Sequence, residues 1–436
     1  MKVETKLQQS PQLFSTLEDT LNQSHPLYKL SNLIDWKMFE DAFRPLYKNK
    51  DVGRPAKPIR LMCGLLILKH VRNLSDEAVV EQWSENVYYQ YFCGATEFIP
   101  GTPCDATELI YFRKRIGEEG IELILKESIR INQRDNDDNP EVVFIDSTVQ
   151  DKNITYPTDS KLRNKIISEC LSIAKKENIV LRQTYTRTIK KLKRDQRFRT
   201  NPKNRQKARK ADKKIKTIAG RLVRELDRKL PSDSCYRDKL ELFHKILSQT
   251  RTSKDKIYSI HEPSTLCISK GKEHKKYEFG NKVSILWSEH GVIVGAKSFR
   301  NEYDGHTIPD AINQYKRLTN KKPKLIAGDR GYRGVKEIDG IKVIIPKPSS
   351  KSQSKQERDE VKKIFKKRAG IEPVIGHLKR DHRLGRNFYK GLLGDSINVM
   401  LAAAAFNFKR VMNALLCLIF VQLNSNKLEQ FEIKYA

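Results

Sequence analysis

The first third of the chain repeats apolar residues at the 3.6-residue period of α-helices. One such segment spans residues 59–71, and a second spans residues 76–93 and follows Ser75, a residue type that caps helix N-termini. A third starts at Asp105, where Glu108 has the spacing of a capping box and the glycines beyond it predict a break or kink. The pattern therefore predicts an all-helical N-terminal region.

The pattern then changes to that of β-strands, with short runs rich in β-branched and aromatic residues. These runs cover residues 142–145, 277–287, 292–299, 324–327 and 341–345. Helical spacing returns over residues 307–318 and in a long charged segment over residues 356–383. The expected order is strand, insertion, strand, strand, helix, strand, strand, helix, which is a mixed α/β arrangement.

The insertion, residues 159–259, carries much of the positive charge. Its residues 187–229 hold 19 Lys and Arg against four acidic residues, about half of the net charge of +31. An apolar stripe in the same stretch predicts helices, broken near Asn201-Pro202. A solvated helix face is the simpler explanation, but so large an excess of one sign would repel itself without an anionic partner. We therefore expect nucleic-acid contacts from Lys190, Lys191, Arg194, Arg209, Lys210, Lys213 and Lys214.

Length and charge set the broad class of protein. A chain of 436 residues is long enough for two or three domains, and its 84 Lys and Arg exceed its 53 Asp and Glu. Nucleic acid is the favoured partner, with ribosomes or membrane surfaces as lesser alternatives. The N-terminal helices carry a basic edge suited either to docking on duplex DNA or to packing and dimerisation, and the sequence leaves both open. This edge comprises Lys69, Arg72, Arg113, Lys114 and Arg115.

Cysteine usage and apolar runs bear on the compartment. The seven cysteines are scattered without a C-x-x-C spacing, so we expect reduced thiols. The N-terminal residues lack the apolar run of a secretion signal. The most apolar stretch, residues 397–423, contains asparagines and cations, which favours a buried or amphipathic helix over a membrane span. A cytoplasmic protein is expected.

Three carboxylates suggest the chemistry. Asp146 and Asp329 each follow a predicted strand, and Glu372 lies in the long charged segment. If the two strands pair, their aspartates come side by side, and a crossing helix would deliver Glu372. Carboxylates that meet from separate elements can bind two Mg²⁺ or Mn²⁺ ions. In two-metal enzymes such ions lie about 3.5–4 Å apart and flank the scissile phosphate. Each residue alone has a simpler explanation: a turn or cap, a pair with Arg330, or a solvated charge.

The long charged segment places four residues of interest on one face of a helix. At about 100° per residue, Phe365, Arg368, Glu372 and Lys379 fall within an arc of roughly 60°. Glu372 would then bind metal while Arg368 and Lys379 contact DNA phosphates, with Arg330 as a further candidate. Pro373 disfavours the helical conformation at Glu372 and predicts a kink there.

This spacing resembles a known signature. Bacterial insertion-sequence transposases with a DDE triad, in particular the IS5 family of the IS4-like group, carry Tyr, two residues, Arg, three residues, Glu, six residues, Lys. The present chain departs only at the first position, where Phe365 replaces Tyr. Residues 146–150 with 156–159, 303–307, and 328–332 are similar to further segments of that family, and residues 43–117 resemble its N-terminal DNA-binding domain.

The resemblance implies a ribonuclease H-like mixed-sheet catalytic domain in which Asp146, Asp329 and Glu372 hold two magnesium ions. It also implies a bacterial, nucleoid-associated homodimer or higher multimer that binds terminal inverted repeats, cleaves with water and joins the freed 3′ hydroxyl to target DNA. Two alternatives stay open: a catalytically decayed DNA-binding protein or regulator, and an RNA-binding protein or structural-RNA nuclease.

The same reasoning divides the chain. The expected domains are an N-terminal helical DNA-binding domain, a catalytic domain in two segments, a basic helical insertion and a C-terminal tail. They span residues 1–135, 140–158 with 260–412, 159–259 and 413–436, respectively.

Overall fold

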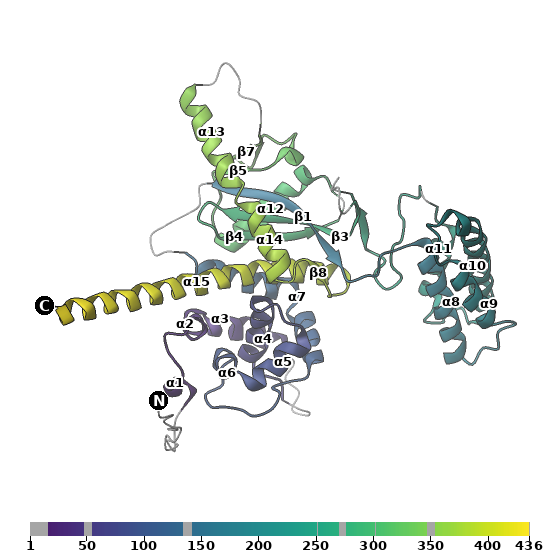
Figure 1. Ribbon diagram of the computed structural model, residues 1–436, viewed down its shortest axis with the longest axis horizontal. Coiled ribbons are helices and arrows are strands. Elements are labelled where there is room, and N and C mark those ends of the chain that lie inside the picture. Colours follow the sequence, from purple (N-terminus) through teal and green to yellow (C-terminus); the bar gives the residue numbers. More distant parts are fainter. Residues whose placement is uncertain are drawn as a thin grey trace. The chain divides into compact units, whose positions relative to one another are not determined.

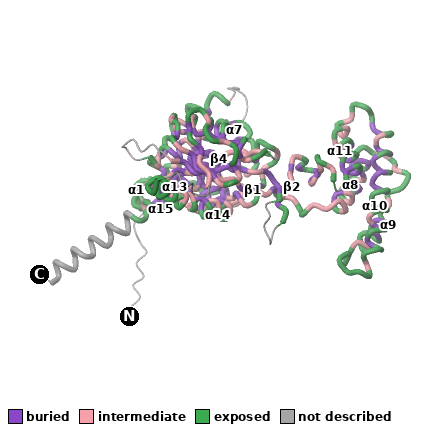
Figure 2. Tube along the Cα trace, turned by 90° about the horizontal axis from the view of Figure 1, so that it is seen from above, coloured by how far each residue is buried: buried purple, intermediate pink, exposed green. Residues whose placement is uncertain are grey.

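The computed structural model of the chain describes residues 16–47, 55–133, 142–250, 252–269, 276–300, 302–346 and 354–435, with side chains to residue 417. Its contacts form two compact units, Met1–Asp151 with Asn281–Ala436 and Lys152–Gly280. Each unit has its own buried apolar cluster (Figure 2). The expected limits at residues 135 and 140 lie outside the described residues, and the expected domain division stays a prediction.

Helices make up the N-terminal part of the first unit. They are α1 (Leu17–Thr20), α2 (Pro26–Leu33), α3 (Trp36–Phe43), the 3₁₀ turn η1 (Arg44–Leu46), α4 (Ile59–Val71), α5 (Asp76–Glu85), α6 (Val87–Phe92) and α7 (Ala106–Arg130). Ser75 caps α5, and Asp105 with Glu108 forms a capping box at the start of α7. Gly117 kinks α7 at a positive φ of 62°. The predicted helices are confirmed, except that the second is two helices separated by Asn86.

A mixed sheet follows in the chain. Its strands are β1 (Val142–Lys152), β2 (Leu266–Ile268), β3 (Glu278–Ser288), β4 (Ile293–Phe299), β5 (Leu325–Ala327), β6 (Glu337–Ile338), β7 (Ile341–Ile344) and β8 (Arg386–Asn387). The order is β2-β3-β1-β5-β7-β6, with β4 also on β3 and β8 on β1. Strand β5 runs parallel to both β1 and β7, and β4 is antiparallel to β3. This order is consistent with the ribonuclease H-like arrangement, which stays a prediction.

The alternation of side chains along β1 sends its residues into two cores. Val143 and Ile145 belong to the large cluster formed with α12 (Ile308–Thr319), the N-terminal helices and the last helix. Phe144 belongs to a smaller cluster on the opposite face. Figure 1 shows the helices α13 and α14 beside the sheet. The sheet is therefore covered on both faces.

The long charged segment folds as two helices, α13 (Lys355–Arg368) and α14 (Ile371–Asp381). The break falls at Ala369 and Gly370. A Cβ on Gly370 would lie 2.7 Å from Cη2 of Trp287, so the ring leaves no room for a side chain there. Pro373 sits in the first turn of α14, where its missing N–H leaves no helical hydrogen bond unmade. The prediction of one helix kinked at Glu372 is therefore wrong, because the break precedes α14 and follows Arg368.

The last helix, α15 (Gly391–Tyr435), packs on α7, β4 and α4. Within it, Gly391–Cys417 is long and apolar enough to cross a membrane by length and composition, but most of the residues between Ile397 and Met412 are buried in the protein core. The prediction of a buried helix is confirmed for this part of α15. The structure has no disulfide, and all seven cysteines, which lie among the described residues, are free thiols.

The second unit is mainly helical. Helices α8 (Asp159–Lys176), α9 (Thr186–Asp195), α10 (Pro202–Lys229) and α11 (Arg237–Ser248) share one apolar core. Asn201 caps α10 by accepting a hydrogen bond from the N–H of Lys203, and Pro202 takes the first helical position. The predicted break near Asn201-Pro202 is confirmed.

Candidate active site

Asp146 and Asp329 occupy matching positions on neighbouring parallel strands. Strands β1 and β5 pair Val142 with Leu325 and Phe144 with Ala327, so each aspartate lies two residues past the last paired position. The match continues beyond that position, because a Cβ on Gly328 would lie 3.2 Å from Cγ2 of Ile145. The backbone at Asp329 is still extended. The strands therefore bring both carboxylates to neighbouring positions, as the sequence predicts. Asp146 does not end its strand, however, because β1 continues to Lys152 and is longer than the predicted run of residues 142–145.

The turn after Asp329 depends on a glycine. The Gly331 N–H donates to Oδ1 of Asp329 at 2.8 Å, which caps the short 3₁₀ turn η3 (Arg330–Tyr332). A Cβ on Gly331 would lie 2.9 Å from that same oxygen and 3.4 Å from Oδ2 of Asp304. Gly331 thus leaves space for two carboxylates that border it from different segments.

Arg368 lies next to Asp146. Its guanidinium Nη2 is 3.5 Å from Oδ2 of Asp146, and both side chains are largely buried, at 13% and 15% exposed. The Ser147 N–H donates to the other oxygen of Asp146 at 2.8 Å. The last residue of α13 therefore balances the charge of the β1 aspartate.

Glu372 lies in the first turn of α14 and is exposed. Its neighbour Ile371 is buried with Phe144 and Ala327. Because alternate strand residues share a face, α14 begins on the face toward which Asp146 and Asp329 point. Among the described residues, no three His, Cys, Asp or Glu side chains lie close enough together to hold a metal ion. The assignment of all three carboxylates as catalytic and metal-binding residues stays a prediction.

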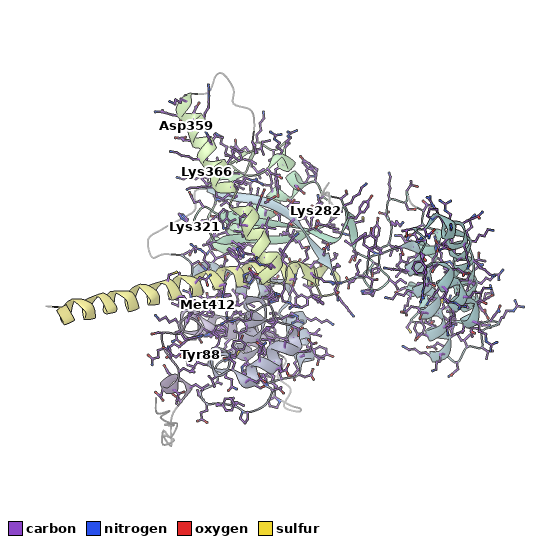
Figure 3. All side chains as sticks on the ribbon, in the orientation of Figure 1. Tyr88, Lys282, Lys321, Asp359, Lys366 and Met412 are labelled. Atoms are coloured by element: carbon purple, nitrogen blue, oxygen red, sulfur yellow. The ribbon has the colours of Figure 1, made fainter. Side chains whose placement is uncertain are left out.

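Asp304 is a fourth carboxylate in this region, in the 3₁₀ turn η2 (Asp304–Thr307). The Ser147 hydroxyl donates to its Oδ2 at 2.7 Å, and Lys282 of β3, labelled in Figure 3, donates to its Oδ1 at 3.0 Å. Asp304 is not one of the three carboxylates selected from the sequence, and no local pattern predicts that a loop aspartate lies beside Ser147. Its segment, Tyr303 to Thr307, is the only sequence signal for it.

Tyr332 is buried beneath these acidic groups. Burial raises the pKa of its hydroxyl well above the usual range, and the negative charges of Asp304, Asp146 and Asp329 raise it further. The phenol therefore stays protonated at neutral pH. A Cβ on Gly328 would lie 3.0 Å from Cδ2 of Tyr332, so the absence of a side chain there admits the ring under the strand end.

The predicted DNA-contacting residues are mostly exposed. Arg330 is exposed beside a hollow of about 450 Å³ that Arg333 and Lys336 also line, and Lys379 of α14 is half-buried. Exposed cations of the second unit are Lys190, Lys191, Arg194, Arg209, Lys210, Lys213 and Lys214. Exposure leaves these side chains accessible to an anion, and their role stays a prediction.

Two cations of the N-terminal basic edge are not accessible. Lys69 and Arg113 are 3% and 4% exposed, respectively. Both form ion pairs with Asp76, at 2.8 and 2.7 Å, and both stack on the ring of Tyr389. They bind the N-terminal helices to the segment before α15, so the idea that these two form a DNA-docking edge is wrong.

Comparison with known proteins gives two family matches. Residues 15–115 match a transposase domain, DUF772, and residues 251–408 match the transposase DDE domain. The second range contains Asp329 and Glu372, whereas Asp146 lies outside both. An uncharacterised protein of Rhizobium meliloti, ORF8 in the nfe locus, is 44% identical over 178 residues, which cover 40% of this chain and 85% of that protein. No solved structure matches the chain.

Proposed function

The chain belongs to the insertion-sequence transposases with a DDE domain, and on that premise we propose that it is an IS5-type enzyme that binds the terminal inverted repeats of its element, cleaves DNA there and joins the ends to target DNA. Asp146, Asp329 and Glu372 are the proposed catalytic carboxylates. The observation that carries this proposal is the matched position of Asp146 and Asp329 on adjacent parallel strands, with α14 starting on the same face.

The residues at this edge suit divalent metal, on which DDE-domain transposases generally depend. Asp146, Asp329 and Glu372 offer only hard carboxylate oxygens, the ligands that Mg²⁺ and Mn²⁺ prefer. When bound, two such ions would activate the attacking hydroxyl and stabilise the leaving oxygen. The proposed ligands are Asp146 and Asp329 from the sheet and Glu372 from α14.

The surrounding side chains have roles of their own in this proposal. Arg368, 3.5 Å from Asp146, limits the repulsion between the carboxylates and is close enough to reach a phosphate oxygen. Tyr332, held protonated by its raised pKa, adds no further negative charge to the group. Arg330 and Lys379 contact DNA phosphates on either side of the scissile bond, and the protein acts as a homodimer or higher multimer on the DNA.

The test uses linear duplex DNA carrying the inverted repeats that flank the coding region. Wild-type protein with Mg²⁺ should nick these ends, and EDTA should abolish the nicking. Asp329→Asn should lower the cleavage rate about a thousandfold or more, the equivalent of several kcal/mol, while end binding persists. Asp339→Asn, an exposed aspartate paired with Lys316, serves as the control and should cleave normally.

The outcomes separate the proposal from its alternatives. If wild-type protein binds the repeats but never cuts them with Mg²⁺ or Mn²⁺, the decayed DNA-binding protein is the better account. If Asp329→Asn cleaves at the wild-type rate, the assignment of this residue is wrong. Preference for RNA duplexes over DNA in competition binding would instead indicate an RNA-directed protein.

A further inference from the structure

The second unit carries a one-sided stripe of cations on α10. At about 100° per residue, Lys210, Lys214 and Arg221 fall within an arc of roughly 40°, with Lys213 and Thr217 beside them. All five side chains are exposed. From Lys210 to Arg221 the stripe runs about 16 Å along the helix axis at 1.5 Å per residue. It is thus a continuous strip of positive charge.

A second set of cations lies on another side of the same helix. Arg205, Arg209 and Lys216 also fall within about 40° of one another, roughly 140° from the first stripe. Asp212 lies next to this set, one turn from both Arg209 and Lys216, and pairs with Arg199 at 2.6 Å. A carboxylate of the protein therefore lies beside this set. Lys207, which pairs with Asp195 at 3.0 Å, lies about 60° from Lys210 and so belongs to the side of the first stripe.

The four cations of the first stripe have no ion pair of their own. Within the described part of the second unit, no carboxylate lies within ion-pair distance of Lys210, Lys213, Lys214 or Arg221. Unpaired like charges held one turn apart destabilise a helix by a few tenths of a kcal/mol per pair. An anionic partner would relieve that repulsion.

The stripe also borders a hollow lined mainly by polar and charged residues. The hollow measures about 490 Å³ and lies between α10 and the start of α9. Its lining consists of Gln183, Tyr185, Thr188, Lys210, Lys213, Lys214, Thr217, Ile218 and Arg221. Its cations and hydroxyl or amide groups are the donors that hold phosphate oxygens, and it contains no carboxylate.

We infer that this groove, formed by Lys210, Lys213, Lys214 and Arg221 with Tyr185 and Thr188, is the surface of the second unit that seats the phosphate backbone of duplex DNA. The side with Arg205, Arg209 and Lys216 faces away from it, so the inference removes Arg209 from the DNA contacts expected from the sequence. The inference rests on the proposed function and deepens it by naming which face of the insertion binds. At 3.4 Å of axial rise per phosphate on one strand, a stripe of about 16 Å spans roughly five phosphates.

The experiment compares two matched triple variants of the full-length protein. One carries Lys210→Gln, Lys214→Gln and Arg221→Gln, and the control carries Arg205→Gln, Arg209→Gln and Lys216→Gln. Each removes three exposed positive charges from α10 and introduces a residue of similar helix propensity. Circular dichroism and thermal unfolding check that both fold. Affinity for a 30-base-pair duplex is then measured across a range of salt concentrations.

The slope of log affinity against log salt counts phosphate contacts, at about 0.9 per contact. The groove variant should lose about 2 to 3 from the magnitude of this slope, while the control keeps the wild-type slope. Equal losses in both variants would indicate general charge attraction and overturn the inference, as would a wild-type slope in the groove variant. A slope change seen only with duplex RNA would overturn it too.

Cleavage assays on the same preparations keep the two proposals apart. If the wild-type protein fails to cut DNA but the two variants still differ in salt slope, the proposed enzyme function is wrong and the proposed DNA-binding groove is supported. If the protein cuts DNA and the variants do not differ, the proposed groove is wrong and the enzyme function is supported.

Discussion

Asp146 and Asp329 lie side by side, each two residues past the position at which Phe144 of β1 pairs with Ala327 of β5. Neighbouring strands are about 4.8 Å apart, and residues two apart on a strand share a face. The two aspartates therefore project from the same face as Phe144 and Ala327, on which Ile371 packs. Under the proposed function the two aspartates have equivalent roles, which leads to a prediction about metal preference.

Replacing either aspartate by cysteine should change which metal supports cleavage. A thiolate is a softer ligand than a carboxylate and binds Mg²⁺ poorly. Asp146→Cys and Asp329→Cys should therefore lose about a thousandfold or more in rate with Mg²⁺, of the order of several kcal/mol, and recover part of it with Mn²⁺. The measurement is the initial cleavage rate in each metal.

Asp304→Cys provides the contrast for that prediction. Asp304 accepts hydrogen bonds from Ser147 and Lys282, so we expect it to support the site rather than to bind metal. Its loss should slow cleavage equally in both metals. Recovery with Mn²⁺ in Asp304→Cys alone would identify it as a ligand in place of one of the two strand aspartates.

Gly331→Ala should impair catalysis without unfolding the protein. The added methyl would lie 2.9 Å from Oδ1 of Asp329, which must shift, and 3.4 Å from Oδ2 of Asp304. A displacement of about 1 Å in a catalytic carboxylate is enough to lower the rate about a hundredfold. Gly376→Ala on α14, where a Cβ meets nothing within 4 Å, is the control and should cleave normally. Equal rates for both variants would show that the turn adapts.

Periodicity in the sequence predicts most of the elements because it is local. The predicted segment 59–71 is α4, and the strands carrying Asp146 and Asp329 pair as expected. Strands β2, β6 and β8 are missed because two or three residues carry no readable alternation.

The features that sequence reasoning misses depend on distant partners. The break before α14 requires Trp287, some eighty residues earlier, to lie against Gly370. Asp304 joins the site through Ser147, whose hydroxyl is 157 positions away in sequence. From the sequence Lys69 and Arg113 are expected to be surface cations, but in the structure Tyr389 and Asp76 cover them. None of these contacts has a local signature.

Gly370→Ala should disturb the start of α14 and with it Glu372. Its Cβ would lie 2.7 Å from Cη2 of Trp287 and 3.1 Å from the carbonyl oxygen of Lys367, neither of which is a flexible chain end. Overpacking of this kind costs about 1–3 kcal/mol. The melting temperature should fall, and the cleavage rate should fall more than end binding. A double variant with Trp287→Leu, which removes the ring, should regain stability relative to Gly370→Ala if the clash is the cause.

Asp76 should prove essential to the stability of the first unit. Burial alone would raise the pKa of its carboxyl, but the hydrogen bonds and charges of Arg113 and Lys69 outweigh burial and lower it to about 2. Asp76→Asn leaves two buried cations without their carboxylate. Breaking a buried pair in this way costs about 3–5 kcal/mol, which urea unfolding at pH 7 should detect. Glu81→Gln, an exposed position on the same helix, should unfold like wild type.

The ion pairs of Asp76 also predict how the free energy of unfolding depends on pH. Because the folded pKa of Asp76, about 2, is below the unfolded value of about 3.9, the ionised carboxylate stabilises the fold fully above pH 4 or so. That contribution is lost as the pH falls from about 4 through 2. The difference in unfolding free energy between wild type and Asp76→Asn should therefore be constant from pH 7 to 5 and shrink below pH 4. A difference that stays constant down to pH 2.5 would show that the charge of Asp76 does not stabilise the two cations, and the loss in the variant would then reflect packing alone.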